Sequence, residues 1–306
     1  MTPDEPNWSE WEKALASDRT HHAWLLAGPA GLGKADFALN AARTLVGQPQ
    51  LAPHPDIIEL RRPPKDDREA RKRDEGKPFE TRRNIGVAQI REMQVKLTTR
   101  PSMGERRAVV VDPADDMERS ASNALLKSLE EPPRGTFFFL VAHHSAQILP
   151  TIRSRCRLLR FRPVAAEKMR ALLDNEFPEA DPETIDVLAR HGKGSIGQAK
   201  RLFELGLDKA VPLLNGLYAA GDSTLEARGT FASTLGARPD RATLSATLDL
   251  AANIVGDYAL SAEPDKLERH MEVHRELVRL RRELPTYNYD PQVIALEIGT
   301  LLGSLR

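Results

Sequence analysis

The chain has 306 residues, of which 41 % are hydrophobic and 29 % are charged. That length suits two or three domains, and that composition supports packed cores and excludes wholesale disorder. Lysine plus arginine equals aspartate plus glutamate, at 44 each, so the chain as a whole is not a polybasic nucleic-acid coat.

Residue usage also indicates the compartment. A single cysteine, Cys156, excludes an internal disulfide and a cysteine-cluster metal site, and it fits a reducing environment. The N-terminal stretch carries acidic residues without the apolar segment of a signal peptide, and no apolar run approaches the length of a membrane span. We therefore expect a soluble, cytoplasmic protein.

The first half of the chain alternates short apolar runs with amphipathic stretches. Predicted helices cover residues 1–22, 35–45, 87–97 and 120–131. Predicted strands cover residues 22–27, 57–60, 108–111, 136–142 and 158–161. Apolar strands that alternate with helices are typical of a parallel sheet covered by helices on both faces, so the predicted fold class here is α/β.

One segment between these elements differs abruptly in composition. Sixteen of the 23 residues in 61–83 are charged, ten of them positive and six negative. Such a composition favours a solvated, flexible loop, which we place at 61–84. A basic arm that touches nucleic acid is the alternative, and its affinity would fall with salt.

Strand signals stop after residue 163, and the remainder of the chain is helical. Breaks at Phe177-Pro178 and at Gly192–Gly194 divide residues 164–206 into three short helices. The predicted organisation is an α/β domain over 1–163, a small helical domain over 164–206 and an all-α domain over 207–306.

A phosphate-binding motif lies between the first apolar strand and the helix after it. Gly28, Gly31, Gly33 and Lys34 match G-x-x-x-x-G-K in the strand–turn–helix context that the motif requires. In such a loop, backbone N–H groups and a helix N-terminus surround a phosphate, and the lysine adds a full positive charge. The sequence therefore predicts a P-loop fold.

Two groups that nucleotide hydrolysis needs are missing from this motif and its partner strand. The residue after Lys34 is Ala35, which lacks the hydroxyl that normally holds Mg²⁺. Asp112 ends an apolar strand and would be the carboxylate on the Mg²⁺ side, but Pro113 stands where a catalytic base would follow. We interpret Asp115 and Asp116 as the start of the next helix, where acids suit the positive end. The site is therefore a degenerate one.

Three further segments carry a family resemblance. They are SASNALLKSLEEPP at Ser120–Pro133, the FFFL strand, and LPTIRSRC at Leu149–Cys156. Together they resemble the clamp-loader AAA+ subunits of bacterial DNA polymerase III, and within that family the delta-prime branch. The resemblance covers residues 20–205 with clear motifs, and beyond them only the helical character and the length agree.

The resemblance implies an AAA+ P-loop domain, a helical lid over 164–206 and a helical collar, used for oligomerisation, over 207–306. It also implies that Arg155 is an arginine finger donated in trans to ATP on a neighbouring subunit, although five arginines between 153 and 162 would also fit a solvated edge. The implied partners are delta and the ATP-hydrolysing gamma/tau subunits in a hetero-pentameric ring, with the sliding clamp and primed DNA reached through the complex.

Three departures from the family pattern concern nucleotide and metal. His143 or His144 stands where a small polar sensor residue is usual, and Gly197 stands where a second sensor arginine is expected. The four-cysteine zinc module common in the family is missing from Gly47–Pro55, and His54 alone cannot make a zinc site. We expect no bound metal.

The preferred hypothesis is a structural adaptor of the clamp loader that has no ATPase activity of its own, within the DNA-directed DNA polymerase III holoenzyme, a nucleotidyltransferase complex. One alternative is an ATP-hydrolysing clamp-loader subunit, against which Ala35 and Pro113 argue. The other is an unrelated P-loop kinase, which should lack both the Ser154-Arg155-Cys156 triplet and the long helical C-terminal region. No cofactor is firmly predicted, and weak ATP binding stays open.

Overall fold

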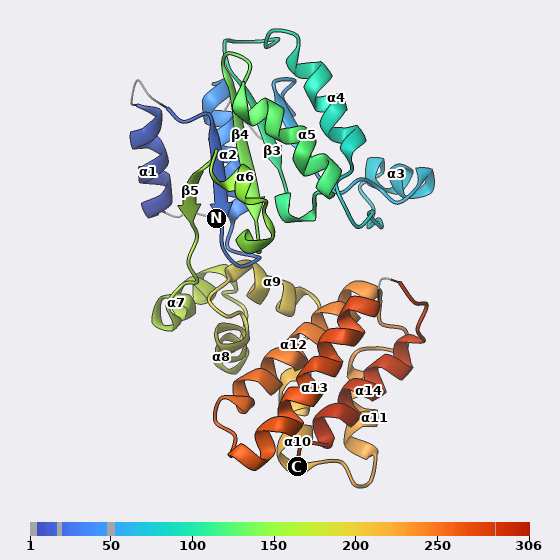
Figure 1. Ribbon diagram of the computed structural model, residues 1–306. Coiled ribbons are helices and arrows are strands. Elements are labelled where there is room, and N and C mark those ends of the chain that lie inside the picture. Colours follow the sequence, from blue (N-terminus) through green and yellow to red (C-terminus); the bar gives the residue numbers. More distant parts are fainter. Residues whose placement is uncertain (1–4, 17–19, 48–52, 285) are drawn as a thin grey trace. The chain divides into compact units, whose positions relative to one another are not determined.

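The computed structural model describes residues 5–16, 20–47, 53–284 and 286–306. The chain divides into two compact units, Met1–Pro163 and Val164–Arg306, which are described here one at a time (Figure 1). The further division of the second unit into a lid over 164–206 and a collar over 207–306 stays a prediction. Among the described residues no helix is long and apolar enough to cross a membrane.

The first unit is built on a five-stranded parallel sheet with the order β2-β3-β4-β1-β5. The strands are β1 (Ala23–Ala27), β2 (Ile57–Leu60), β3 (Arg107–Val111), β4 (Thr136–Ala142) and β5 (Arg157–Arg160). All five apolar runs that the sequence marked as strands are present. β4 is the central strand, and β1 lies inside the sheet, pairing with β4 on one side and with the edge strand β5 on the other. The carboxyl ends of the strands therefore meet along one edge of the sheet.

Helices cover both faces of this sheet, because alternate strand residues point to opposite sides. On one face Trp24, Val110 and Phe139 pack with α1 (Glu5–Leu15) and α2 (Lys34–Val46). On the other face the strands pack with α4 (Val87–Leu97) and α5 (Arg119–Glu130), with the short helix α6 (Pro150–Arg153) beyond. The helix expected over 1–22 is shorter, and residues 1–4 and 17–19 of that expectation lie outside the described residues.

The charged segment 61–84 has local structure that its composition did not predict. Helix α3 (Asp67–Asp74) begins at Asp66, whose carboxylate accepts the Glu69 N–H. Backbone hydrogen bonds join the residues before α3 to those after it, and the Lys65 N–H donates to the Glu80 carbonyl at 3.0 Å. Glu69 is 7 % exposed, and its carboxylate accepts hydrogen bonds from Lys72 Nζ and from the Glu80 N–H, both at 2.7 Å. This segment is held by ion pairs and backbone hydrogen bonds, whereas the other elements are held by burial of apolar side chains.

The second unit contains helices and no strand among its described residues. Its helices are α7 (Ala166–Glu176), α8 (Pro182–His191), α9 (Ile196–Glu204), α10 (Ala210–Ala220), α11 (Glu226–Thr234), α12 (Arg241–Ala259), α13 (Pro264–Glu283) and α14 (Pro291–Gly303). One cluster of buried apolar side chains runs from Met169 to Leu305 through all of them. Several helices begin at an aspartate or serine that accepts a first-turn N–H, as at Asp181, Ser195 and Asp240.

Candidate functional site

The phosphate loop lies where the sequence placed it, between β1 and α2. Gly31 and Gly33 have φ of 79° and 75°, in the left-handed region that favours glycine, and Gly33 is the residue that precedes the first turn of α2. At Gly28 the need for glycine is steric, because a Cβ there would lie 2.3 Å from the Phe161 carbonyl oxygen. The three glycines therefore fit a tight turn from strand to helix.

Lys34 is turned onto its own loop. The side chain is 2 % exposed, and Nζ donates to the carbonyl oxygens of Gly28 at 2.7 Å and Pro29 at 2.5 Å. Burial lowers the pKa of the ammonium to about 8, although the nearby carboxylates of Asp115 and Asp112 act in the opposite direction. The positive charge that would bind a phosphate is thus engaged by two loop carbonyl groups.

Three carboxylates lie just beyond β3, and each has a partner within the protein. Asp112 lies 3.9 Å from Arg61 Nε, and Asp116 lies 3.2 Å from Arg62 Nε. Asp115 accepts backbone N–H groups of two consecutive residues, His143 at 3.1 Å and His144 at 2.9 Å. The acids at the carboxyl end of β3 are therefore neutralised by arginines or bound by backbone amides.

The surroundings act differently on the pKa values of these acids. Burial raises the pKa of Asp115, but the N–H groups of His143 and His144 lower it by more, so the carboxyl titrates below its usual range. For Asp116 burial dominates, and the pKa is raised although Arg62 opposes the effect. The sequence interpretation of both acids as helix starters was incomplete. They lie in a 3₁₀ turn, Ala114–Asp116, and α5 begins only at Arg119.

His143 directly follows β4, where the family resemblance implied a sensor residue. Burial and the neighbouring Lys34 ammonium lower the pKa of its imidazole, so the ring is neutral near pH 7. Its Nδ1 is buried and has no hydrogen-bond partner among the described residues. A neutral imidazole close to Lys34 can accept or donate one hydrogen bond, but it supplies no charge.

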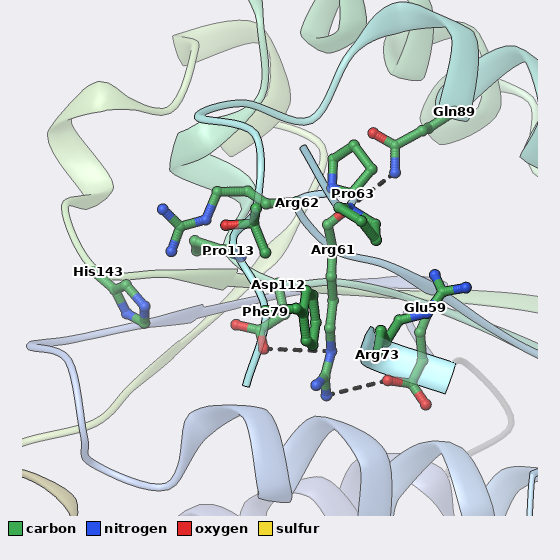
Figure 2. A pocket seen from close by; sticks show the side chains of 12 residues that line it. Glu59, Arg61, Arg62, Pro63, Arg73, Phe79, Gln89, Asp112, Pro113 and His143 are labelled. Carbon is green, nitrogen blue, oxygen red and sulfur yellow. Dashed lines mark hydrogen bonds and ion pairs between the residues drawn. The ribbon is translucent and has the colours of Figure 1, made fainter. Parts of the chain in front are cut away.

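A cavity of about 710 Å³ lies between the segment 61–84 and the carboxyl ends of β2 and β3. Its lining includes the two prolines Pro63 and Pro113, the aromatic Phe79 and the arginines Arg61 and Arg73. Figure 2 shows the Arg61 side chain reaching through this space, with ion pairs to Asp112 and Glu59. The sequence analysis did not predict this cavity, because much of its wall comes from the segment 61–84, which was interpreted as a solvated loop or a basic arm.

The residues at this edge of the sheet do not suit a nucleotide-bound magnesium ion. Mg²⁺ prefers near-octahedral oxygen ligands at about 2.0–2.1 Å. Ala35 has no oxygen on its side chain, Pro113 has none, and the Asp112 carboxylate faces a guanidinium. Among the described residues, no group of three or more His, Cys, Asp or Glu side chains has the arrangement of a metal site.

Arg155 lies apart from the phosphate loop, just after α6. Its side chain is 35 % exposed, with Nη2 at 2.6 Å from Glu130 Oε1 and Nη1 donating to the Thr151 carbonyl at 2.8 Å. Burial raises the pKa of the adjacent Cys156 thiol to about 12, so this sulfur is protonated and contributes packing. The guanidinium is thus accessible at the surface, and its bonds join it to α5 and α6.

The remaining site predictions are placed as follows. His54 accepts the Asp56 N–H at 3.1 Å, whereas residues 48–52 of the expected zinc-module position lie outside the described residues. Gly197 lies in the first turn of α9, in the second unit, and presents no side chain. Sequence reasoning missed Arg61, Arg62 and the hydrogen bonds that the Asp115 carboxylate accepts from the N–H groups of His143 and His144. The first two were hidden among ten basic residues.

Comparison with known proteins assigns the family. Residues 4–165, more than half of the chain, match the family described as DNA polymerase III, delta subunit. The chain is 31 % identical over 218 residues to the DNA polymerase III subunit delta' of Pseudomonas aeruginosa, covering 64 % of this chain and 62 % of the relative. The corresponding protein of Escherichia coli is 30 % identical over 221 residues, covering 64 % and 61 %. The matches therefore span about three fifths of these relatives.

A solved structure agrees with the fold. The DNA polymerase III gamma subunit-related protein of Thermotoga maritima superposes with a TM-score of 0.53 at 16 % identity, over 96 % of this chain and 98 % of the other. The predicted α/β domain followed by helical segments is thus confirmed as the fold of this chain. The chain belongs to the DNA polymerase III delta-subunit family, and among its relatives it is similar to the proteins named subunit delta'.

Proposed function

We propose that this chain is a structural subunit of the DNA polymerase III clamp loader, without ATPase activity of its own, which donates Arg155 to ATP on a neighbouring subunit. It would act in the cytoplasm, in a hetero-pentameric ring with delta and gamma/tau subunits, during loading of the sliding clamp onto primed DNA. Its relatives named delta' and gamma support membership in such a complex.

The observation that carries the proposal is the state of Lys34. Its ammonium donates to Gly28 and Pro29 of its own loop, in a site where neither Ala35 nor Pro113 can hold a metal or activate a water. Hydrolysis needs an oriented water and charge stabilisation at the γ-phosphate. This chain supplies neither requirement at its own phosphate loop. An accessible guanidinium can still supply charge stabilisation to a γ-phosphate that is bound by a neighbouring subunit.

Arg155 can serve in that way because it is not buried. An arginine that reaches a neighbour's γ-phosphate stabilises charge in the transition state, which is worth about 10³–10⁵ in rate at that site. Leaving Glu130 costs little, because an exposed ion pair contributes only about 0–1 kcal/mol. The guanidinium can therefore exchange one anionic partner for another.

The test uses a reconstituted clamp loader in which this chain carries Arg155→Ala, with Arg153→Ala as the matched control from the same exposed stretch. Arg155→Ala should lower DNA-stimulated ATP hydrolysis and clamp loading, while ring assembly on size-exclusion chromatography is retained. Arg153→Ala should leave both rates near those of the wild type. Equal hydrolysis in the Arg155→Ala and wild-type rings would refute the assignment of the finger.

The alternative of an ATP-hydrolysing subunit is tested on the isolated chain. We expect no ATP turnover above buffer. Turnover that disappears in Lys34→Ala would instead identify an active motor.

A further inference from the structure

The sheet register places Arg61 beside Asp112. β2 and β3 pair in parallel with Leu60 opposite Val111, and the Asp112 N–H donates to the Leu60 carbonyl at 2.9 Å. The next residue along β2, Arg61, therefore lies next to the acid that ends β3. Neighbouring strands are about 4.8 Å apart, so a side chain at that position readily reaches the carboxylate.

Independent contacts fix the backbone that presents Arg61. Gln89 of α4 donates to the Arg61 carbonyl at 2.9 Å, and Pro63 and Pro64 restrict the chain that follows. The other end of the segment is also anchored at the same place, because the Ile85 N–H donates to the Asp116 carbonyl at 2.9 Å. One end of the segment 61–84 is therefore held by α4, and the other end is held at the turn that carries the acids.

Arg61 itself has two carboxylate partners. Its Nη2 lies 3.1 Å from Glu59, and its Nε lies 3.9 Å from Asp112 (Figure 2). Arg62 pairs with Asp116 in the same way at 3.2 Å. A guanidinium stays charged at every physiological pH, so these cations cannot be removed by titration. A metal ion at these acids would have to displace them.

We propose that Arg61 and Arg62 replace the metal ion at the carboxyl end of β3, so that the segment 61–84 closes this P-loop site to Mg²⁺-bound nucleotide. The guanidinium groups neutralise Asp112 and Asp116, and the third acid, Asp115, is bound by backbone N–H groups. Charge that Mg²⁺ would balance is thus already balanced within the protein. The proposal concerns this chain alone, so it can fail while the role of Arg155 stands, and the reverse also holds.

The experiment measures binding of a fluorescent ATP analogue to the isolated full chain, in Mg²⁺ and in EDTA. For the wild type we expect either no binding or dissociation constants that agree within about twofold in the two conditions. In Arg61→Ala/Arg62→Ala, Mg²⁺ should tighten binding by about tenfold relative to EDTA, because two half-exposed ion pairs no longer compete for the acids. Adding Asp112→Asn should remove that gain.

Two controls separate this mechanism from others. Arg73→Ala removes a third arginine of the same cavity, one that pairs with Asp74 instead of an acid after β3, and it should behave as the wild type. Ala35→Ser restores the missing hydroxyl while both arginines stay, and it should gain no Mg²⁺ dependence. If the alanine double variant melts early, Arg61→Gln/Arg62→Gln, which keeps length and polarity, decides the question.

Two results would overturn the proposal. One is metal-independent or absent binding in a folded double variant. The other is Mg²⁺-tightened binding by the wild type or by Ala35→Ser to the same extent as by the double variant, since either would show that the arginines do not close the site.

Discussion

Replacing Asp56 by asparagine is expected to destabilise the first unit by about 3–5 kcal/mol, the cost of breaking a buried ion pair. Asp56 is fully buried and accepts the Ser102 N–H at 2.7 Å and the Met103 N–H at 2.9 Å. Arg107, 4 % exposed, lies 3.5 Å from the same carboxylate. Asparagine would remove the negative charge opposite the guanidinium and could present an N–H₂ group to the backbone donors.

This loss is a large fraction of the total free energy of unfolding. Domains are stable by about 5–15 kcal/mol, and in a unit of this size each kcal/mol shifts the melting temperature by about 2–4 °C, so a fall of about 10 °C is expected. Tryptophan fluorescence in urea measures it, because the three tryptophans, Trp8, Trp11 and Trp24, all lie in the first unit.

The matched control is Glu92→Gln, which removes one partner of the exposed pair with Lys96 and should change stability by less than about 0.5 kcal/mol. A difference below about 1 kcal/mol between Asp56→Asn and the wild type would refute the assignment of Asp56 as an essential buried counter-charge. Burial raises the pKa of Asp56, but its two N–H donors and Arg107 lower it by more. Its stabilisation is therefore complete above the unfolded-state value of about 4 and is lost as the pH falls below it, a slope that the asparagine variant should lack.

Three shorter predictions follow from other sites. Gly28→Ala should destabilise the first unit by on the order of 1–3 kcal/mol in the same urea assay, because its Cβ would lie 2.3 Å from the Phe161 carbonyl oxygen, whereas Gly104→Ala, which meets nothing within 4 Å, should be neutral. Cys156, with its pKa raised to about 12 by burial, should resist iodoacetamide at pH 8 in the folded protein and react once unfolded, as mass spectrometry would record. Burial lowers the pKa of His191, so the second unit should lose stability as the pH falls below about 6.5, and His191→Gln should flatten that trend in melts followed by circular dichroism.

The sequence predicted the sheet and its helices because burial on both faces makes parallel strands apolar along their whole length. Ala23–Ala27 and Arg107–Val111 are buried at every position, and such runs can be recognised without a structure. The segment 61–84 misled the same reasoning. Glu69 there is buried through hydrogen bonds with Lys72 and Glu80, and composition does not reveal which charges pair.

The same limit applies to the site. Gly28, Gly33 and Lys34 were predicted because one local motif contains them, and Asp112 because it ends an apolar strand. Arg61 becomes a neighbour of Asp112 only through the pairing of β2 with β3, which joins residues 51 positions apart in the chain. By composition Arg61 is one of ten basic residues in its segment. The strand register distinguishes it from the others, because Leu60 pairs with Val111 and Arg61 therefore lies beside Asp112.

The absence of the catalytic groups at this site is consistent with the presence of arginines beside its acids. A site that hydrolyses ATP must leave its strand-end acid free for metal, so an arginine next to that acid would be harmful there. Once Ala35 and Pro113 have removed the metal-binding hydroxyl and the base, an uncompensated carboxylate beside β3 would only cost stability, and a cation beside it is favourable. Arginines beside the strand-end acid are therefore expected only where the catalytic groups are absent. In a chain of this fold that carries Ser or Thr after the P-loop lysine and an acid after Asp112, we would expect a neutral or acidic residue in place of Arg61.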